Sequence, residues 1–184
     1  RPTLPQEAEF LVIDNGSTDG SGAIGESFGA RVVTTDNRAG FLTGLNAAFT
    51  ASTRHWVWFL QNDVLVGPGT FAAMQDAANL HSWRNVLQPV LYQQGGALNH
   101  AGGRYYWPGY GVGHRTVPRG KGTVVPIELF ATACFAMTRD TYEWVGPFDE
   151  QFAPAYYEDV DYSLRLARLG IPRYLALRAQ ARHV

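Results

Sequence analysis

Cysteine is almost absent from this 184-residue chain, and the single residue of this type excludes several kinds of chemistry. Cys134 alone can form neither an intramolecular disulfide nor a cysteine-based zinc site. It lies in an apolar run over 130–137, which favours a buried structural thiol over a nucleophile. Long apolar runs of about 18 residues are also missing, so no membrane-spanning segment is predicted. No signal-peptide pattern occurs, and both ends look like cuts within a longer sequence.

An excess of charge of either sign is lacking too, since 15 basic residues face 16 acidic ones for a net charge of -1. This balance implies no broad attraction to nucleic acid or to an anionic membrane. The basic residues are scattered, apart from a loose group at Arg115, Arg119 and Lys121. A hydrophobic content of 46% predicts a globular protein, and the length predicts one domain over 1–184 with a core of its own.

Strands and helices alternate in the first half of the chain. Apolar runs predict strands over 9–13, 30–34 and 55–60. Between and after them, helical spacing predicts a helix over 40–51 and Pro68 starts one over 68–80, while 17–28 is interpreted as a weak helix interrupted by glycines. This order predicts an α/β fold with a mostly parallel sheet flanked by helices.

After about residue 85 the pattern changes. Glycines and aromatics predict irregular hairpins over 95–122, and a long strand follows over 127–137. A helix is predicted over 162–169, with Val160 on its apolar face, and a last strand over 173–177. This half is interpreted as a mixed extension of the same sheet rather than a separate domain.

Three carboxylates gather at the start of the helix predicted after residue 157. Glu158, Asp159 and Asp161 fall within four residues. A helix dipole stabilises ionised carboxylates at this position, and an ionised carboxylate held there can act as a general base. The alternative that these acids only cap the helix stays open on this pattern alone.

Two further acids follow predicted strands, where ligands bind in open α/β sheets. Asp14 is followed by Asn15 and a hydroxyl-rich turn, which suits a polar ligand or simply an Asx turn with a helix cap. Asp63 follows Gln61 and Asn62 at the end of a very apolar strand. A carboxylate there is costly unless it binds something, such as a divalent cation bridging two phosphates, although a loop cap is the alternative.

Other motifs carry weaker signals. Residues 20–25 match G-x-G-x-x-G and Asp36 follows the next strand, which raises an NAD(P)-dependent oxidoreductase as an alternative. Six residues separate these glycines from the preceding strand, whereas a dinucleotide fingerprint needs its first glycine directly after it. His183 follows the last predicted strand. It is either a structural residue or a residue that contacts a metal or a phosphate. Aromatics over 102–110, Trp107 included, could bind sugar rings or pack under loops.

The ordered set of motifs resembles glycosyltransferase family 2, with its GT-A fold, and most closely its bacterial rhamnosyltransferase-like members. The matching pieces cover nearly the whole chain: residues 12–21, 37–41 with Gly44 and Asn46, 59–64, 101–103, 146–150, 156–161, Leu164-Arg165, Gly170 and His183.

The resemblance implies an inverting enzyme that moves a sugar from a UDP- or dTDP-sugar to a hydroxyl of a glycan or lipid-linked acceptor. It implies a catalytic base at Asp159, with Glu158 orienting the acceptor. It also implies a Mg²⁺ or Mn²⁺ ion held by Asp63 and His183. The donor nucleotide would be contacted by Asp14, Asn15, Asn37, Asn46, Gln61 and Asn62, and the acceptor by Trp107 and Tyr157.

The same resemblance divides the chain into a nucleotide-binding half, about 1–85, and an acceptor and catalytic half, about 86–184. It implies a bacterial protein of cell-wall or polysaccharide synthesis, located in the cytoplasm or peripherally associated with the inner face of the membrane. No nucleic-acid partner is expected.

Two departures from the family pattern bear on activity. Gln61 stands where the DxD-like motif usually has its first acid. The first strand of the family also precedes this chain's first residue, so it is expected to be missing here. Both departures leave a non-catalytic carbohydrate-binding module or pseudoenzyme as an alternative.

Overall fold

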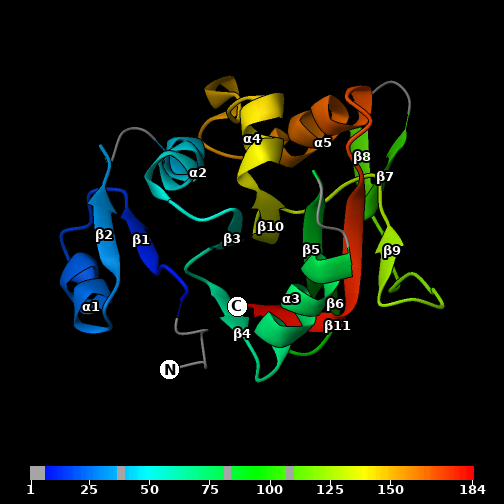
Figure 1. Ribbon diagram of the computed structural model, residues 1–184, viewed down its shortest axis with the longest axis horizontal. Helices are drawn as coiled ribbons and strands as arrows, with labels where there is room; N and C mark the ends of the chain where they lie inside the picture. The colour runs from blue at the N-terminus through cyan, green and yellow to red at the C-terminus, as the bar shows by residue number, and fades with distance from the viewer. Residues whose placement is uncertain (1–6, 37–39, 81–83, 107–109) are drawn as a thin grey trace.

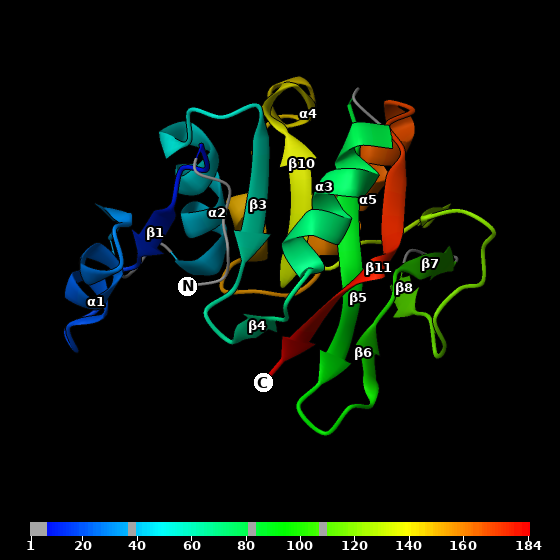
Figure 2. The same cartoon turned by 60° about the horizontal axis from the view of Figure 1, so that its bottom comes forward.

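The computed structural model describes residues 7–36, 40–80, 84–106 and 110–184. A seven-stranded sheet forms its centre. Helices α2 (Gly40–Ala51), α4 (Arg139–Val145) and α5 (Glu158–Arg168) cover one face of this sheet, and α3 (Thr70–Leu80) covers the other (Figures 1 and 2). The unit of β1 (Leu11–Asp14), α1 (Ser21–Ser27) and β2 (Arg31–Thr34) lies to one side, with β1 and β2 paired in parallel. Within the described ranges, no helix is long and apolar enough to span a bilayer.

The central sheet has the order β3–β10–β5–β11–β4, with β6 paired to β5 and β9 to β11. Its strands are β3 (Trp56–Leu60), β4 (Val64–Val66), β5 (Val86–Gln93), β6 (Leu98–His100), β9 (Val124–Pro126), β10 (Cys134–Thr138) and β11 (Arg173–His183). A separate antiparallel hairpin joins β7 (Gly103–Tyr106) to β8 (Tyr110–Gly113). The predicted α/β class is confirmed. The sheet is mixed rather than mostly parallel, because among the described pairs only β1–β2 and β5–β11 are parallel.

The sheet is buried on both faces, and alternate residues of each strand contribute to different clusters. Phe135 and Met137 of β10 face α2, α4 and α5, whereas Ala136 faces Met74 and Ala77 of α3. Two-sided burial explains why β3 and β10 are almost continuously apolar, whereas the end of β11 alternates exposed polar residues with buried alanines.

Several predicted bounds differ from the structure. The strand expected over 127–137 is confined to β10, because the residues before it bond to different partners instead of one ladder. Leu129 N–H donates to Gly103 O, and Ala133 O accepts from Gln61 N–H. The last strand runs on to His183, so this histidine belongs to β11 instead of following it. Strands β4 and β5 and helix α4 were not predicted at all.

Candidate active site

Asp63 and His183 meet at the edge of the central sheet. The antiparallel pairing of β4 with β11 places His183 opposite Val64, and Val184 N–H donates to Asp63 O at 2.9 Å. The two side chains converge, with His183 Nε2 3.2 Å from Asp63 Oδ2. Residues that are 120 positions apart in the sequence are therefore brought together as the resemblance implies.

The second carboxylate oxygen of Asp63 lacks a hydrogen-bond donor among the described residues. This atom, Oδ1, is also buried. A buried carboxylate oxygen without a donor is costly, so a cation at this point would remove an energetic deficit. One carboxylate and one imidazole suit Mn²⁺ or Mg²⁺ when phosphates and water supply the other ligands. No cluster of three or more His, Cys, Asp or Glu side chains that could hold a metal ion exists in the described ranges.

The three acids at the start of α5 have three different environments. Glu158 is 7% exposed, and its Oε1 accepts a hydrogen bond of 2.7 Å from Thr132 Oγ1. Asp161 forms an ion pair with Arg165 one turn along the helix, at 2.8 Å. Asp159 accepts from Val160 N–H at 2.8 Å and makes no ion pair in the described part of the chain. Helix capping therefore accounts for none of the three completely.

Asp159 has an electrostatic environment that suits a base. Its pKa is raised from the ordinary 3.8 to about 6, mainly by burial and secondly by the neighbouring charge of Glu158, which together outweigh the lowering effect of the Val160 N–H. A carboxyl group with this pKa is mostly ionised at neutral pH, yet it accepts a proton more readily than an ordinary aspartate.

A three-residue segment before β10, Ala131–Ala133, connects the two parts of the site. Ala133 O accepts from Gln61 N–H at 3.0 Å, in the turn that leads to Asp63. Thr132 holds Glu158, and Ala131 N–H donates to Gln88 Oε1 at 2.8 Å. Consecutive residues of this segment thus bond to the turn that leads to Asp63 and to the acid cluster at the start of α5.

Gln88 and Thr132 were missed by the sequence reasoning. Gln88 is fully buried in β5, and its amide is also in contact with His100 Nδ1 at 2.9 Å. A single amide inside the otherwise apolar run 86–92 was a usable signal, because a buried polar side chain needs partners. Thr132 gave no such signal, since its role depends on a contact across 26 residues.

The backbone before α5 is unusual. Tyr156 and Tyr157 have φ values of 82° and 69°, which non-glycine residues rarely adopt. Their side chains are 82% and 55% exposed. Consecutive strained residues with exposed aromatic rings next to Glu158 and Asp159 are typical of a functional loop. The acceptor role of Tyr157 stays a prediction.

The residues after β1 have local partners. Asp14 Oδ1 accepts from Ser17 N–H at 2.8 Å, and the hydroxyl and N–H of Ser17 keep the Asp14 pKa below its ordinary value. Asn15 accepts from Thr35 Oγ1 at 2.5 Å. This geometry is that of an Asx turn, and the nucleotide contacts predicted for Asp14, Asn15, Gln61 and Asn62 stay predictions.

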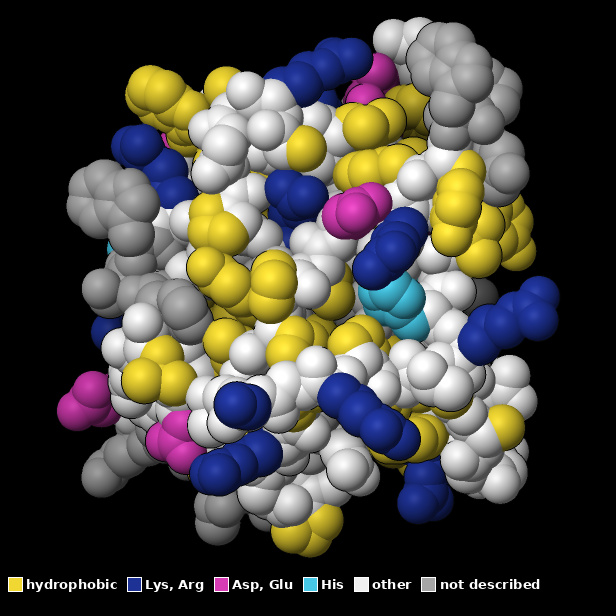
Figure 3. Space-filling model, turned by 90° about the vertical axis from the view of Figure 1, so that its right-hand side faces the viewer, with side chains coloured by type: hydrophobic (Ala, Val, Ile, Leu, Met, Phe, Trp, Pro, Cys, Tyr) yellow, Lys and Arg dark blue, Asp and Glu magenta, His cyan; other side chains and the backbone are white. Residues whose placement is uncertain are grey.

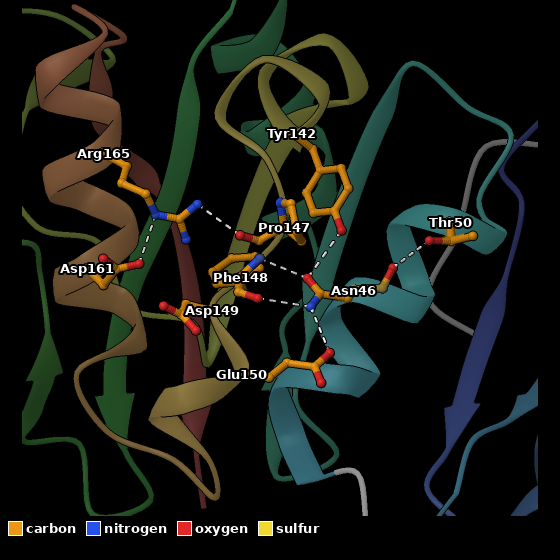
Figure 4. A pocket seen from close by; sticks show the side chains of 9 residues that line it. All are labelled: Asn46, Thr50, Tyr142, Pro147, Phe148, Asp149, Glu150, Asp161 and Arg165. Carbon is orange, nitrogen blue, oxygen red and sulfur yellow. Dashed lines mark hydrogen bonds and ion pairs between the residues drawn. The ribbon is translucent and has the colours of Figure 1, made fainter.

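A groove of about 680 Å³ lies beside α5, between the 147–150 loop and helices α2 and α4 (Figure 4). Asn46 occupies its wall, where its amide binds the backbone N–H and C=O of Phe148 at 2.9 and 3.0 Å. Tyr142 and Glu150 contact the same amide at 3.2 Å each. Asn46 is thus fully engaged by protein groups, and its predicted nucleotide contact stays a prediction. The groove includes Asp161 and Arg165 but not Asp159.

The glycines of the alternative dinucleotide motif have a packing role. A methyl group at Gly22 would lie 3.0 Å from Asp14 Oδ2, and one at Gly25 would lie 3.1 Å from Val12 Cγ2. Both glycines let α1 approach β1 closely. Two other predicted site residues, Asn37 and Trp107, lie outside the described residues.

A family model described as Glycosyl transferase family 2 matches residues 4–143. The chain belongs to this family. Family 2 membership and the GT-A fold were both predicted from the sequence, and both are confirmed. An NAD(P)-dependent oxidoreductase is thereby left without support.

Relatives with curated names are glycosyltransferases. The chain is 26% identical over 189 residues to the N-acetylglucosaminyl-diphospho-decaprenol L-rhamnosyltransferase of Mycobacterium tuberculosis, a match covering 87% of this chain and 61% of the relative. It is 48% identical over 44 residues to a galactofuranosyl glycosyltransferase of Leishmania donovani, a match covering 24% of this chain and 10% of that relative. The chain therefore spans less than two thirds of the relatives' own length.

Solved structures share the fold at low sequence identity. GalNAc-T7 with UDP, GalNAc and Mn²⁺ superimposes with a TM-score of 0.77 at 14% identity, over 96% of this chain and 37% of that one. The mannosyltransferase PcManGT of Pyrobaculum calidifontis, in complex with GDP-Man and Mn²⁺, gives 0.64 at 16% identity, over 95% and 47% of the two chains.

Proposed function

We propose that this protein is an inverting glycosyltransferase that moves a sugar from a UDP- or dTDP-sugar to a hydroxyl group of a glycan or lipid-linked acceptor. The observation that supports this proposal most directly is the Ala131–Ala133 segment, which bonds both to Gln61, in the turn that leads to Asp63, and to Glu158, the neighbour of Asp159. A displacement reaction requires a charge that stabilises the leaving diphosphate and a base for the acceptor, and in this proposal the Asp63–His183 pair and Asp159 supply them.

Asp159 acts as the general base in this proposal. It takes the proton of the acceptor hydroxyl while the oxygen attacks the anomeric carbon of the donor. The bond between that carbon and the diphosphate oxygen breaks on the opposite face, so the configuration inverts. Glu158 orients the acceptor through Oε2, which is buried and without a hydrogen-bond partner in the described structure.

Asp63 and His183 hold Mg²⁺ or Mn²⁺ in this proposal. A bound divalent cation supplies positive charge to the leaving diphosphate and lowers the barrier to its departure. Support comes from Asp63 Oδ1, which has no hydrogen-bond partner among the described residues, and from the Mn²⁺ complexes of two structural neighbours. Asp14, after β1, is assigned to the base of the nucleotide, because a carboxylate accepts from the ring N–H of uracil or thymine.

A lipid-linked acceptor is favoured over a soluble glycan. The Mycobacterium tuberculosis relative is named for a diphospho-decaprenol substrate, and it matches 87% of this chain. We assign the reaction to bacterial cell-wall or polysaccharide synthesis at the cytoplasmic face of a membrane.

Substitution of the proposed metal ligand tests the function. Nucleotide-sugar binding is measured by calorimetry for the parent and Asp63→Asn, with and without Mn²⁺. The parent should bind UDP- or dTDP-sugar more tightly with Mn²⁺, and the variant should lose at least about tenfold in affinity under that condition only.

Asp76→Asn serves as the matched control, because Asp76 is an exposed acid on α3, away from the site. Equal affinity of Asp63→Asn and the parent with Mn²⁺ present would reject the metal assignment. Donor binding without any transfer or hydrolysis would instead identify a non-catalytic carbohydrate-binding protein.

A further inference from the structure

The net charge of the chain conceals a strong separation of charge. Segments 86–138 and 171–184 together contain seven Lys and Arg residues but a single acid, Glu128, for a local net charge of +6. The rest of the chain carries a net charge of -7, because the whole chain has -1. The two segments are joined in the structure by the pairing of β9 with β11 and of β5 with β11.

Five of these cations lie exposed on the side of the molecule formed by β7, β8, β9 and the edge of β11. We call this surface the basic face and define it by Arg104, Arg115, Arg119, Lys121 and Arg178. Figure 3 views that side and has Lys and Arg side chains spread over it among apolar ones. None of the five forms an ion pair with any residue in the described ranges.

Backbone contacts hold the basic face together. His114 N–H donates to Gly102 O at 2.8 Å, which brings Arg115 beside the start of β7 and Arg104. Leu177 N–H donates to Thr123 O at 2.9 Å, which brings Lys121 beside Arg178. Arg104 and Arg178 therefore lie on strands β7 and β11, and Arg115, Arg119 and Lys121 lie in the loop between β8 and β9, which these backbone bonds attach to the same surface.

Apolar side chains are exposed between the cations. Tyr106 of β7 is 48% exposed and Val112 of β8 is 42% exposed. Val112 stands directly opposite Arg104 in the hairpin. A surface that combines exposed Lys and Arg with exposed aromatic and aliphatic groups complements the interface of an anionic bilayer.

The basic face adjoins the acid cluster. A methyl group at Gly111 would lie 3.1 Å from Val160 Cγ2, so β8 packs directly on the residue that follows Asp159. The charge of Asp159 also acts on the half-buried Tyr105 of β7. A bilayer bound to this face would lie next to the acceptor side of the site.

We propose that the basic face docks the protein onto the headgroups of an anionic phospholipid bilayer. The hairpin of β7 and β8 then presents the Glu158–Asp159 end of the site to the membrane surface. This orientation of the acceptor depends on the proposed function, whereas the binding to lipid headgroups does not.

Vesicle co-sedimentation tests the docking. The protein is mixed with vesicles of phosphatidylglycerol and phosphatidylcholine, or of phosphatidylcholine alone, at low and high salt. We expect binding to the anionic vesicles only, weakening as salt screens the charges. Arg115→Glu combined with Arg119→Glu should reduce this binding at least about tenfold, since each surface cation contributes measurably near anionic lipid.

The double variant Arg54→Glu with Arg168→Glu is the charge-matched control, because both arginines are exposed and lie outside the basic face. Lys121→Glu with Arg178→Glu is a second test pair from the other part of the face, and melting temperatures establish that each variant is folded.

An equal loss of vesicle binding in the control variant, or equal binding of the parent to uncharged vesicles, would overturn the proposal. Binding to nucleic acid or soluble anionic polysaccharide without binding to vesicles would also overturn it. Nucleotide-sugar affinity of the variants should not change, so failure of the docking and failure of the proposed function are separable.

Discussion

Identical residue types acquire different properties at the start of α5 because their neighbours differ. Asp161 has a guanidinium partner, Glu158 has a hydroxyl donor, and Asp159 has mainly burial and a nearby like charge. The sequence placed all three acids at a helix start. It could not separate them, because the largest cause of the raised Asp159 pKa is desolvation by residues distant in sequence.

Replacement of Asp159 should remove the base without disturbing donor binding. Asp159→Asn is expected to lower turnover by about 10²–10⁴-fold, the usual contribution of a positioned base. Donor affinity should stay close to the parental value. Asp161→Asn should cost much less, because Asp161 is paired with Arg165. Steady-state kinetics would contradict the assignment if Asp159→Asn kept near-parental turnover while Glu158→Gln abolished it.

The same substitution should change the pH dependence of stability. The folded-state pKa of Asp159, about 6, exceeds the ordinary 3.8, so the folded protein holds this proton more tightly than the unfolded chain. The contribution of Asp159 to folding stability is therefore complete below about pH 3.8 and is lost as the pH rises through about 6. Asp159→Asn should therefore melt at a higher temperature than the parent at pH 7.5, and the gain should shrink toward pH 4. A gain that is constant with pH, or a loss, would argue against a strained ionised Asp159.

At the scale of elements, the first half of the chain was predictable apart from β4, whereas in the second half α5 was predicted, β10 and β11 only in part, and β5 and α4 not at all. Strands β1, β2 and β3 are short apolar runs ended by polar turns, so their positions follow from local pattern. Strand β5 has a proline at its centre and a glutamine, which together obscure its pattern. The 127–133 region has strand-like residues but bonds to several partners, and only tertiary structure decides that outcome.

Asn46 connects two elements and should matter for stability. Asn46→Ala would leave the N–H and C=O of Phe148 and the hydroxyl of Tyr142 without their present partner. The expected loss is about 2–4 kcal/mol in the free energy of unfolding, measured by urea denaturation. Gln75→Ala, on the exposed side of α3, should change stability little. A loss of donor affinity with unchanged stability would instead support the nucleotide contact predicted from the sequence.

At the scale of the whole molecule, the net charge of the sequence concealed a separation of positive and negative charge that the fold produces. A net charge of -1 predicted no attraction to anionic surfaces, but β9 and β11 gather cations that are some 60 residues apart on one face. Conversely, the meeting of Asp63 with His183 could be predicted only through the resemblance to family 2. No local pattern relates a turn after β3 to the end of β11.

The single thiol provides a reporter of global unfolding. Cys134 is fully buried in β10 between β3 and β5, and burial raises its pKa to about 12. A thiol reagent at pH 8 should react at a rate that follows the unfolding of the whole sheet, and the dependence of that rate on urea should match the equilibrium transition. Rapid stoichiometric labelling in native buffer would instead place Cys134 in a region that opens locally.

The Ala131–Ala133 segment should couple the motions of the two parts of the candidate site, the turn before Asp63 and the acid cluster at the start of α5. Ala131, Thr132 and Ala133 are bonded in turn to the sheet centre, to the acid cluster and to the turn before Asp63. A local fluctuation that frees one of these residues also strains the bonds of the next two. Amide hydrogens of Gln61 and Ala131 should consequently exchange with solvent as one cooperative unit. Natural variation within these three positions would then alter the use of both substrates together, so selection could not tune one of them independently here.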